Sequence, residues 1–172
     1  KPKGPGVAWT VDQVVAAARA GLAGRNFANG RRSYQAARCG ACHRFDGAGG
    51  ATGPDLSNVA GRFSIKDLTE SLIVPSKVVS DQYKASTVIT TAGKVITGRI
   101  VNDNKGTLTI LTDPFDATKI STVPADEVDQ AQPSKTSLMP EKLLHPLNKN
   151  ELLDLLAYLL SRGNPDDRVF AE

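Results

Sequence analysis

The stretch Cys39-Gly40-Ala41-Cys42-His43 contains both cysteines of this 172-residue chain and one of its two histidines. Two thiols three positions apart lie on the same side of a helical turn, and the histidine that follows offers an imidazole from the same face. This C-x-x-C-H spacing is a signature of covalent haem attachment. The thiols add to the two vinyl groups of one haem, and the imidazole binds the iron. The sequence therefore predicts one haem c, held by Cys39, Cys42 and His43.

Two other kinds of site use paired cysteines. A thioredoxin-like redox pair needs a preceding strand in a βαβ setting, which this sequence lacks. A zinc site needs about four ligands, and His145 is the only obvious further candidate. Because the cysteines are so close in sequence, they also cannot form the disulfide framework of a small secreted domain.

The sixth ligand of the predicted haem iron is a separate question. The chain has one methionine, Met139, in the segment Ser137-Leu138-Met139-Pro140. Methionines often only fill gaps in a core, but this one lies beside a proline that fixes the local backbone, just before the last expected helix. We therefore expect Met139 to bind the iron. His145, which precedes Pro146, and an open sixth site are the alternatives.

Composition and charge narrow the class of protein. The 40% hydrophobic and 23% charged residues are those of a globular protein. No apolar run approaches the roughly 18 residues that a membrane helix needs. Residues 1–44 carry eight basic residues and one acid, whereas the remainder carries thirteen basic residues and seventeen acids. This split favours a protein partner with an acidic docking surface, and the lack of interleaved aromatics argues against nucleic acid.

Four helices are expected from their start and stop signals. The first covers about residues 11–23 behind a Thr10/Gln13 capping box, and the second covers about 30–39 with Asn29 as its cap. The third follows Ser64 and ends before Pro75, and the last begins after Asn148 and stops at Gly163.

The period of the hydrophobic pattern changes between the third and fourth helices. Segments rich in Val, Ile and Thr, separated by turn residues, predict an antiparallel meander with strands at 83–91, 94–102, 107–112 and 119–123. The glycine-rich stretch 46–53 lacks the spacing of a phosphate-binding loop, so we expect a flexible loop there. The predicted fold class is α+β.

The order of these motifs resembles that of class I c-type cytochromes. The C-x-x-C-H pentapeptide is followed by Thr52-Gly53-Pro54-Asp55-Leu56, then by Gly61-Arg62 and by Met139-Pro140. The β-rich insert and the segment 155–159 are similar to the haem-binding domain family of planctomycetes and verrucomicrobia. The resemblance covers about residues 27–162. The 96 positions between His43 and Met139 exceed those of a minimal class I domain, and the β-meander fills the excess.

The resemblance implies roles for further residues. Pro54 stands where class I cytochromes offer a carbonyl to the proximal imidazole, which fixes its tautomer. Arg62 stands where a guanidinium often meets a haem propionate. Gly30 and Tyr34 on the second helix, and Leu155 and Tyr158 on the last, stand where these two helices cross.

The predicted domain plan has three parts. Residues 1–26 form a linker and an amphipathic helix, residues 27–163 form the cytochrome domain with its β-rich insert at 83–128, and residues 164–172 form a tail.

The resemblance implies an electron carrier rather than an enzyme, with Fe(III)/Fe(II) cycling under His43/Met139 ligation. It also implies a periplasmic or otherwise extracytoplasmic location, a redox partner protein and a periplasmic dehydrogenase as electron donor. If Met139 does not bind the iron, a haem protein with an open sixth site, of ligand-binding or peroxidase type, is the alternative. A third possibility makes the insert a docking module for protein or carbohydrate.

Overall fold

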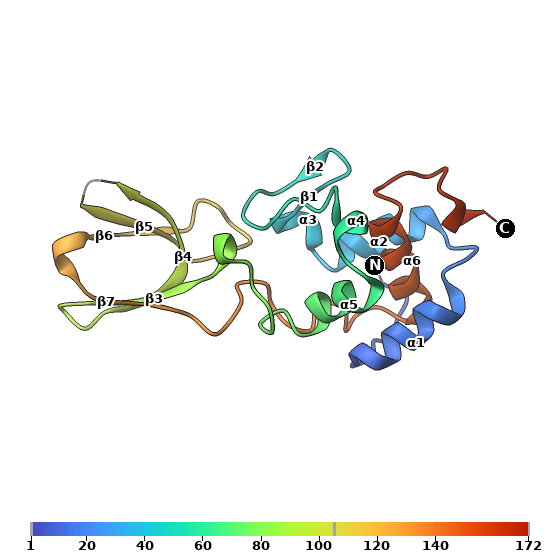
Figure 1. Ribbon diagram of the computed structural model, residues 1–172, viewed down its shortest axis with the longest axis horizontal. Coiled ribbons are helices and arrows are strands. Elements are labelled where there is room, and N and C mark those ends of the chain that lie inside the picture. Colours follow the sequence, from blue (N-terminus) through green and yellow to red (C-terminus); the bar gives the residue numbers. More distant parts are fainter. Residues whose placement is uncertain (1, 105, 172) are drawn as a thin grey trace. The chain divides into compact units, whose positions relative to one another are not determined.

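A computed structural model describes residues 2–104 and 106–171 and divides the chain into two compact units. The helical unit contains the residues up to Lys77 and those from Glu141 onward. The β unit contains Val78–Pro140. Figure 1 labels the elements of both units. The chain thus leaves the helical unit once and returns to it, while the domain boundaries expected at residues 26 and 163 stay predictions.

The elements of the helical unit follow in chain order. They are α1 (Val11–Gly21), α2 (Phe27–Ala36), α3 (Cys39–Cys42), β1 (Arg44–Phe45), β2 (Ala48–Gly49), α4 (Val59–Arg62), α5 (Ile65–Ile73), α6 (Lys149–Leu160) and the 3-10 turn η3 (Arg168–Phe170).

Local capping explains where most of these helices begin. Thr10, Ser64 and Asn148 each accept a hydrogen bond from the backbone N–H three residues later, and each forms a complete capping box. The predicted starts of α1, α5 and α6 are therefore confirmed. The prediction for the second helix was three residues late. Asn26 rather than Asn29 is its cap, because the Asn29 N–H donates to Asn26 Oδ1 at 2.8 Å.

The crossing of α2 and α6 forms the centre of the helical unit (Figure 1). A Cβ on Gly30 would lie 2.8 Å from Tyr158 Cβ and 2.9 Å from the Asp154 carbonyl carbon, so only glycine allows this approach. Tyr34 and Tyr158 meet edge to face with ring centroids 5.8 Å apart. The expected close packing of these two helices is confirmed.

The first helix belongs to the helical unit as well. Its buried residues Val14 and Ala18 lie on one face, and α1 packs against α5 and α6. Burial of one apolar stripe is what the 3.6-residue period of this helix predicts.

The β unit is one antiparallel sheet of five strands. These are β3 (Ser86–Thr90), β4 (Val95–Asn104), β5 (Thr107–Leu111), β6 (Ile120–Pro124) and β7 (Val128–Pro133), in the order β6-β5-β4-β3-β7. The 3-10 turn η1 (Asp81–Tyr83) precedes them, and a second turn, η2 (Ala125–Glu127), links the last two strands.

The four strands of the predicted meander are confirmed with slightly different ends, but the prediction missed β7. This strand pairs with β3 at the edge of the sheet, and five of its six residues are exposed. An edge strand with so little burial has no apolar alternation to reveal it.

The β unit has its own hydrophobic core. Val88, Ile96, Ile110 and Val123 are buried, and Ile100, Leu108 and Val128 pack against them. An irregularity between Ile100 and Asn102 shifts the pairing of β4 with β5, as a β-bulge does. The α+β mixture expected from the sequence is therefore present, with the β part as a separate compact unit.

Candidate functional site

The two cysteines lie on one helical turn, α3, and both are thiols in the structure. They are buried, with exposed fractions of 7% for Cys39 and 9% for Cys42. Burial raises the pKa of the Cys39 thiol to about 12. Arg38 adopts a left-handed backbone conformation that separates this turn from α2. The helical turn expected at the C-x-x-C-H motif is confirmed.

His43 follows the turn with its imidazole fixed by a backbone carbonyl. Its Nδ1 lies 2.7 Å from the carbonyl oxygen of Pro54, and only a protonated Nδ1 can donate there. Nε2 then carries the lone pair, which is the form that ligates a metal. Burial lowers the pKa of His43, while the bond to Pro54 opposes that shift. This is the contact that the resemblance implies for Pro54.

Three glycines enclose the C-x-x-C-H turn. A Cβ on Gly53 would lie 2.9 Å from Cε1 and Nδ1 of His43, one on Gly50 would lie 2.9 Å from the carbonyl carbon of Ala41, and one on Gly49 would lie 3.1 Å from that of His43. Each of these positions lacks room for a side chain. The Gly50 and Gly53 N–H groups donate to the carbonyls of residues 40 and 42, at 2.9 and 2.8 Å.

The loop expected at residues 46–53 is wrong in its first part, whereas residues 50–53 have neither helix nor strand. Its first part is a β1–β2 hairpin in which Phe45 pairs with Ala48. The two turn residues, Asp46 and Gly47, have φ of 50° and 74°, as a two-residue hairpin turn requires. The Asp-Gly pair was the signal that could have revealed it.

Two tyrosine hydroxyl groups donate hydrogen bonds to residues 43–46, the segment that leads from the C-x-x-C-H turn into the hairpin. Tyr34 Oη donates to the carbonyl oxygen of His43 at 3.3 Å, and Tyr158 Oη donates to Asp46 Oδ2 at 3.1 Å. The Phe45 ring packs against both, with its centroid 5.6 Å from that of Tyr34 and 5.1 Å from that of Tyr158. The sequence predicted only packing for these tyrosines. Their polar contacts join the crossing of α2 and α6 to the peptide segment that begins at His43.

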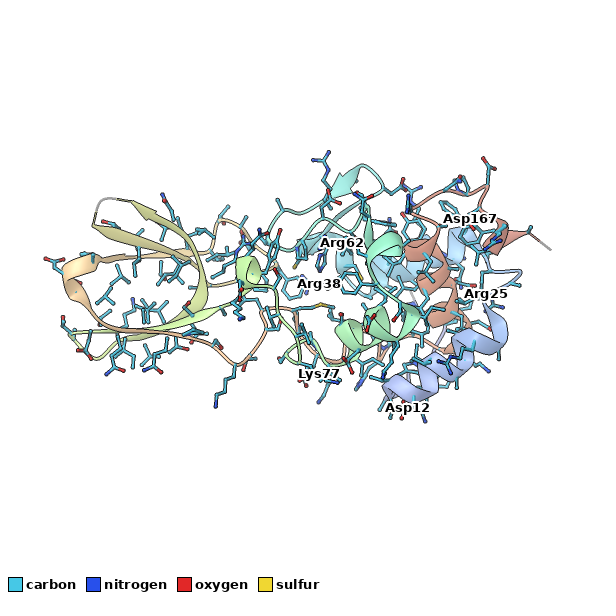
Figure 2. All side chains as sticks on the ribbon, viewed as in Figure 1. Asp12, Arg25, Arg38, Arg62, Lys77 and Asp167 are labelled. Carbon is cyan, nitrogen blue, oxygen red and sulfur yellow. The ribbon has the colours of Figure 1, made fainter. Side chains whose placement is uncertain are left out.

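The remaining predicted residues belong to other elements of the chain. Arg62 ends α4 with an exposed side chain and is labelled in Figure 2. Met139 lies near the end of the β unit, where its N–H donates to Ser137 Oγ at 3.1 Å. His145, the alternative ligand, belongs to the helical unit. Iron ligation by Met139 and propionate binding by Arg62 stay predictions.

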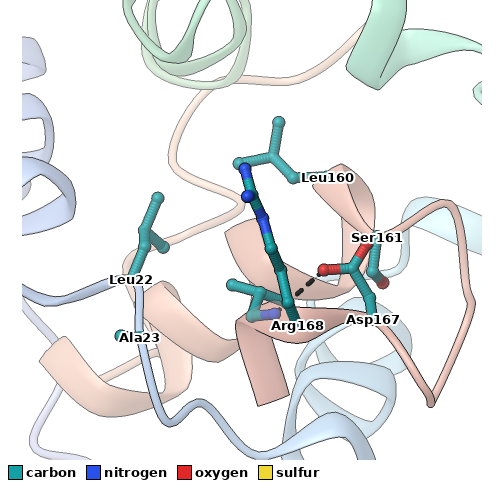
Figure 3. Close-up of a pocket in the computed structure, with 7 residues that line it drawn as sticks. Leu22, Ala23, Leu160, Ser161, Asp167 and Arg168 are labelled. Carbon is teal, nitrogen blue, oxygen red and sulfur yellow. Dashed lines mark hydrogen bonds between the residues drawn. The ribbon is translucent and has the colours of Figure 1, made fainter. Parts of the chain in front are cut away.

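A cavity of about 490 Å³ opens between the end of α1 and the C-terminal turn (Figure 3). Its lining consists of Leu22, Ala23, Leu160, Ser161, Asp167, Arg168 and Val169. None of the predicted site residues lies in it. Across residues 2–104 and 106–171, no helix has the length and hydropathy required to span a bilayer.

Comparison with known proteins places the motif in a family context. The family model described as Cytochrome c matches residues 27–94, less than half of the chain. The matched part contains the C-x-x-C-H turn, Pro54 and Arg62, but not Met139. No curated protein matches the chain. The match supports a c-type cytochrome that carries electrons with a covalently attached haem c, whereas the narrower resemblance to the planctomycete and verrucomicrobial family stays a prediction.

Proposed function

We propose that this protein is a monohaem c-type cytochrome of the class I type, in which Cys39 and Cys42 attach the haem and His43 and Met139 bind its iron. When bound, this group supplies reversible one-electron Fe(III)/Fe(II) chemistry. The observation that carries the proposal is the 2.7 Å contact between His43 Nδ1 and the Pro54 carbonyl, directly after two buried thiols on one turn.

The donor set fits the group. Thiols at positions 39 and 42 share one side of α3, and the hydrogen bond to Pro54 leaves Nε2 of His43 as the electron-pair donor. Gly53 packs against the ring, and the Tyr34 hydroxyl binds the backbone of the same residue. A ligand held on several sides changes little between oxidation states, which suits an electron carrier.

Met139 is proposed as the sixth ligand because it is the single thioether of the chain. Methionine beside histidine raises the reduction potential of c-type cytochromes. Pro140 restricts the backbone directly after it. Arg62 is proposed to pair with a haem propionate, since its guanidinium is exposed at the end of α4 and suits a carboxylate.

The partner is proposed to be a protein with an acidic docking surface, and the electron donor a periplasmic dehydrogenase. The basic first quarter of the chain supports this. Four of its arginines are exposed: Arg31 and Arg32 on α2, and Arg38 and Arg44 directly before and after the C-x-x-C-H segment. We therefore expect the rate of electron transfer to an acidic partner to fall as salt rises. An extracytoplasmic location fits the attachment of bacterial haem c after export.

Absorption spectra of the haem-loaded protein and of Met139→Ala test the ligand set. We expect a low-spin spectrum for the wild type in both oxidation states, with slow or no uptake of carbon monoxide. Met139→Ala should keep its haem through acid–organic extraction, bind carbon monoxide rapidly and show a lower reduction potential. His145→Ala is the matched control and should behave as the wild type.

Two outcomes would contradict the proposal. Rapid carbon monoxide binding by the reduced wild type favours the alternative, an open sixth site of ligand-binding or peroxidase type. Loss of the spectrum in His145→Ala rather than in Met139→Ala assigns the sixth ligand to His145.

A further inference from the structure

Residues 3–9, here called the N-terminal strap, lie against the segment that leads the chain back into the helical unit and on to α6. Two donors of the strap bind this segment directly, and a third binds the first turn of α6. The Lys3 N–H donates to Glu151 Oε1 at 2.6 Å, the Val7 N–H donates to the His145 carbonyl at 3.0 Å, and Trp9 Nε1 donates to the Leu147 carbonyl at 3.2 Å. These contacts join residues that are 138 to 148 positions apart in the sequence.

The fit between the two segments is close. A Cβ on Gly6 would overlap the carbonyl oxygen of His145 and lie 3.0 Å from its carbonyl carbon and 3.3 Å from Pro146 Cα. The obstacle is backbone, which cannot rotate away as a side chain can. Gly6 is therefore a position where any side chain would push the strap off the segment it covers.

The segment that the strap covers, residues 141–148, is here called the return segment. It has neither helix nor strand, and α6 begins only at Lys149. Two backbone hydrogen bonds of 3.0 Å stabilise it as successive turns. The His145 N–H donates to the Lys142 carbonyl, and the Leu147 N–H donates to the Leu144 carbonyl. Leu144 and Leu147 anchor it in the core with exposed fractions of 3% and 0%.

Trp9 is the point at which the strap joins the interior. Together with Leu72 and Ile73 at the end of α5, it lines a small cavity that also touches Leu144 and His145 of the return segment. The indole thus lies between the end of α5 and the return segment, and its N–H donates to the main-chain carbonyl of Leu147.

We propose that the N-terminal strap is a positioning element for the Met139 ligand. The return segment begins two residues after Met139, so its anchoring restrains the chain on the C-terminal side of the thioether. A restrained segment loses less conformational entropy when its methionine binds iron. This inference rests on the proposed His43/Met139 ligation. It gives a function to residues that precede the family match at residue 27.

The test compares imidazole binding to the Fe(III) forms of the haem-loaded wild type and four variants. Gly6→Ala is expected to displace the strap while every residue of the return segment and of α6 keeps its identity. Trp9→Phe keeps an aromatic ring but removes the indole N–H, so it serves if Gly6→Ala folds poorly. Met139→Ala gives the imidazole affinity of a protein in which no thioether competes for the iron. Val14→Ala removes buried methyl groups from α1 and controls for general loss of stability.

We expect Met139→Ala to bind imidazole most tightly. Gly6→Ala should bind it roughly tenfold more tightly than the wild type, and Trp9→Phe should lie between Gly6→Ala and the wild type. Val14→Ala should lower the melting temperature but leave the imidazole affinity unchanged. The reduction potential of Gly6→Ala should move toward that of Met139→Ala.

Three results would overturn the strap proposal, and only the first of them would also reject the assignment of Met139 as ligand. If Met139→Ala and the wild type bind imidazole equally, both the ligand assignment and the strap proposal are wrong. If Met139→Ala binds more tightly while Gly6→Ala and Trp9→Phe match the wild type, only the strap proposal fails. If Val14→Ala gains as much affinity as Gly6→Ala, the effect is general destabilisation and not positioning.

Discussion

At the scale of single residues, the imidazole of His43 is held by backbone on two sides. The Pro54 carbonyl accepts from Nδ1, and Gly53 lies so close to the ring that no Cβ fits. Fixing one nitrogen with a carbonyl defines which nitrogen remains a base. The chemistry of the site thus depends on two residues that carry no functional group of their own.

Gly53→Ala tests this arrangement. The new methyl group would lie 2.9 Å from Cε1 and Nδ1 of His43, so either the ring or the loop must move and the bond to Pro54 should weaken. Overpacking of this kind typically costs about 1–3 kcal/mol. We expect a lower free energy of unfolding in urea and a shifted absorption spectrum of the haem-loaded protein.

Gly61→Ala is the matched control for that experiment. Its Cβ would meet only the guanidinium of Arg162 at 3.2 Å, and a flexible side chain can yield. Equal effects of the two substitutions would show that the packing of Gly53 against His43 has no special role.

At the scale of elements, α6 holds the β1–β2 hairpin in place. The Tyr158 hydroxyl donates to Asp46 at the hairpin turn, across 112 positions of sequence. Phe45, the strand residue before that turn, packs against the same tyrosine. The Tyr158 side chain therefore contacts the hairpin that follows His43 in two ways, by a hydrogen bond to Asp46 and by ring packing against Phe45.

Tyr158→Phe should reveal this contact through its pH dependence. Burial, and then the Asp46 carboxylate, raise the pKa of Tyr158 from 10.0 to about 12. Below pH 10 the phenol is protonated in both folded and unfolded chains, so its contribution to stability is complete. Between pH 10 and 12 the unfolded chain loses the proton first, so the free energy of unfolding falls.

We expect Tyr158→Phe to be less stable than the wild type at pH 8 by about 1 kcal/mol, the usual net value of one hydrogen bond. Its stability should decline less steeply from pH 10 to 12. Urea unfolding at several pH values measures both effects, with Tyr83→Phe in the β unit as control. Parallel curves for wild type and Tyr158→Phe would contradict the role of the tyrosine.

At the scale of the whole molecule, the two units have separate cores. The β unit closes on itself, because β7 pairs with β3 and the Ser134 N–H donates to the Ala85 carbonyl at 2.9 Å. The chain therefore enters and leaves the β unit beside the same strand. Its core residues, Val88, Ile96, Ile110 and Val123, all come from its own strands.

Residues 78–140 should consequently fold when produced alone. We expect a β-type circular dichroism spectrum and a cooperative thermal transition of modest stability, because a domain of this size buries a small core. Ile110→Val should lower the stability of this fragment by about 0.5–1.5 kcal/mol. A fragment without a cooperative transition would show that the β unit depends on the helical unit.

What the sequence by itself determined is local. The C-x-x-C-H turn, three capping boxes and four strands follow from interactions within a few residues or from alternation along one strand, so their pattern is visible in the chain. The second helix cap and the Asp46-Gly47 hairpin were also local. They were missed because a second asparagine and a run of glycines offered competing interpretations.

What only the tertiary structure decided depends on surfaces that packing brings together. The packing of Gly53 against an imidazole, the bond from Tyr158 to Asp46 and the contacts of the strap with the return segment join residues from 10 to 138 positions apart. The polar edge strand β7 is defined by its partner and not by its own pattern. Nothing in a short window of sequence encodes such contacts, because their free energy exists only once both segments lie side by side.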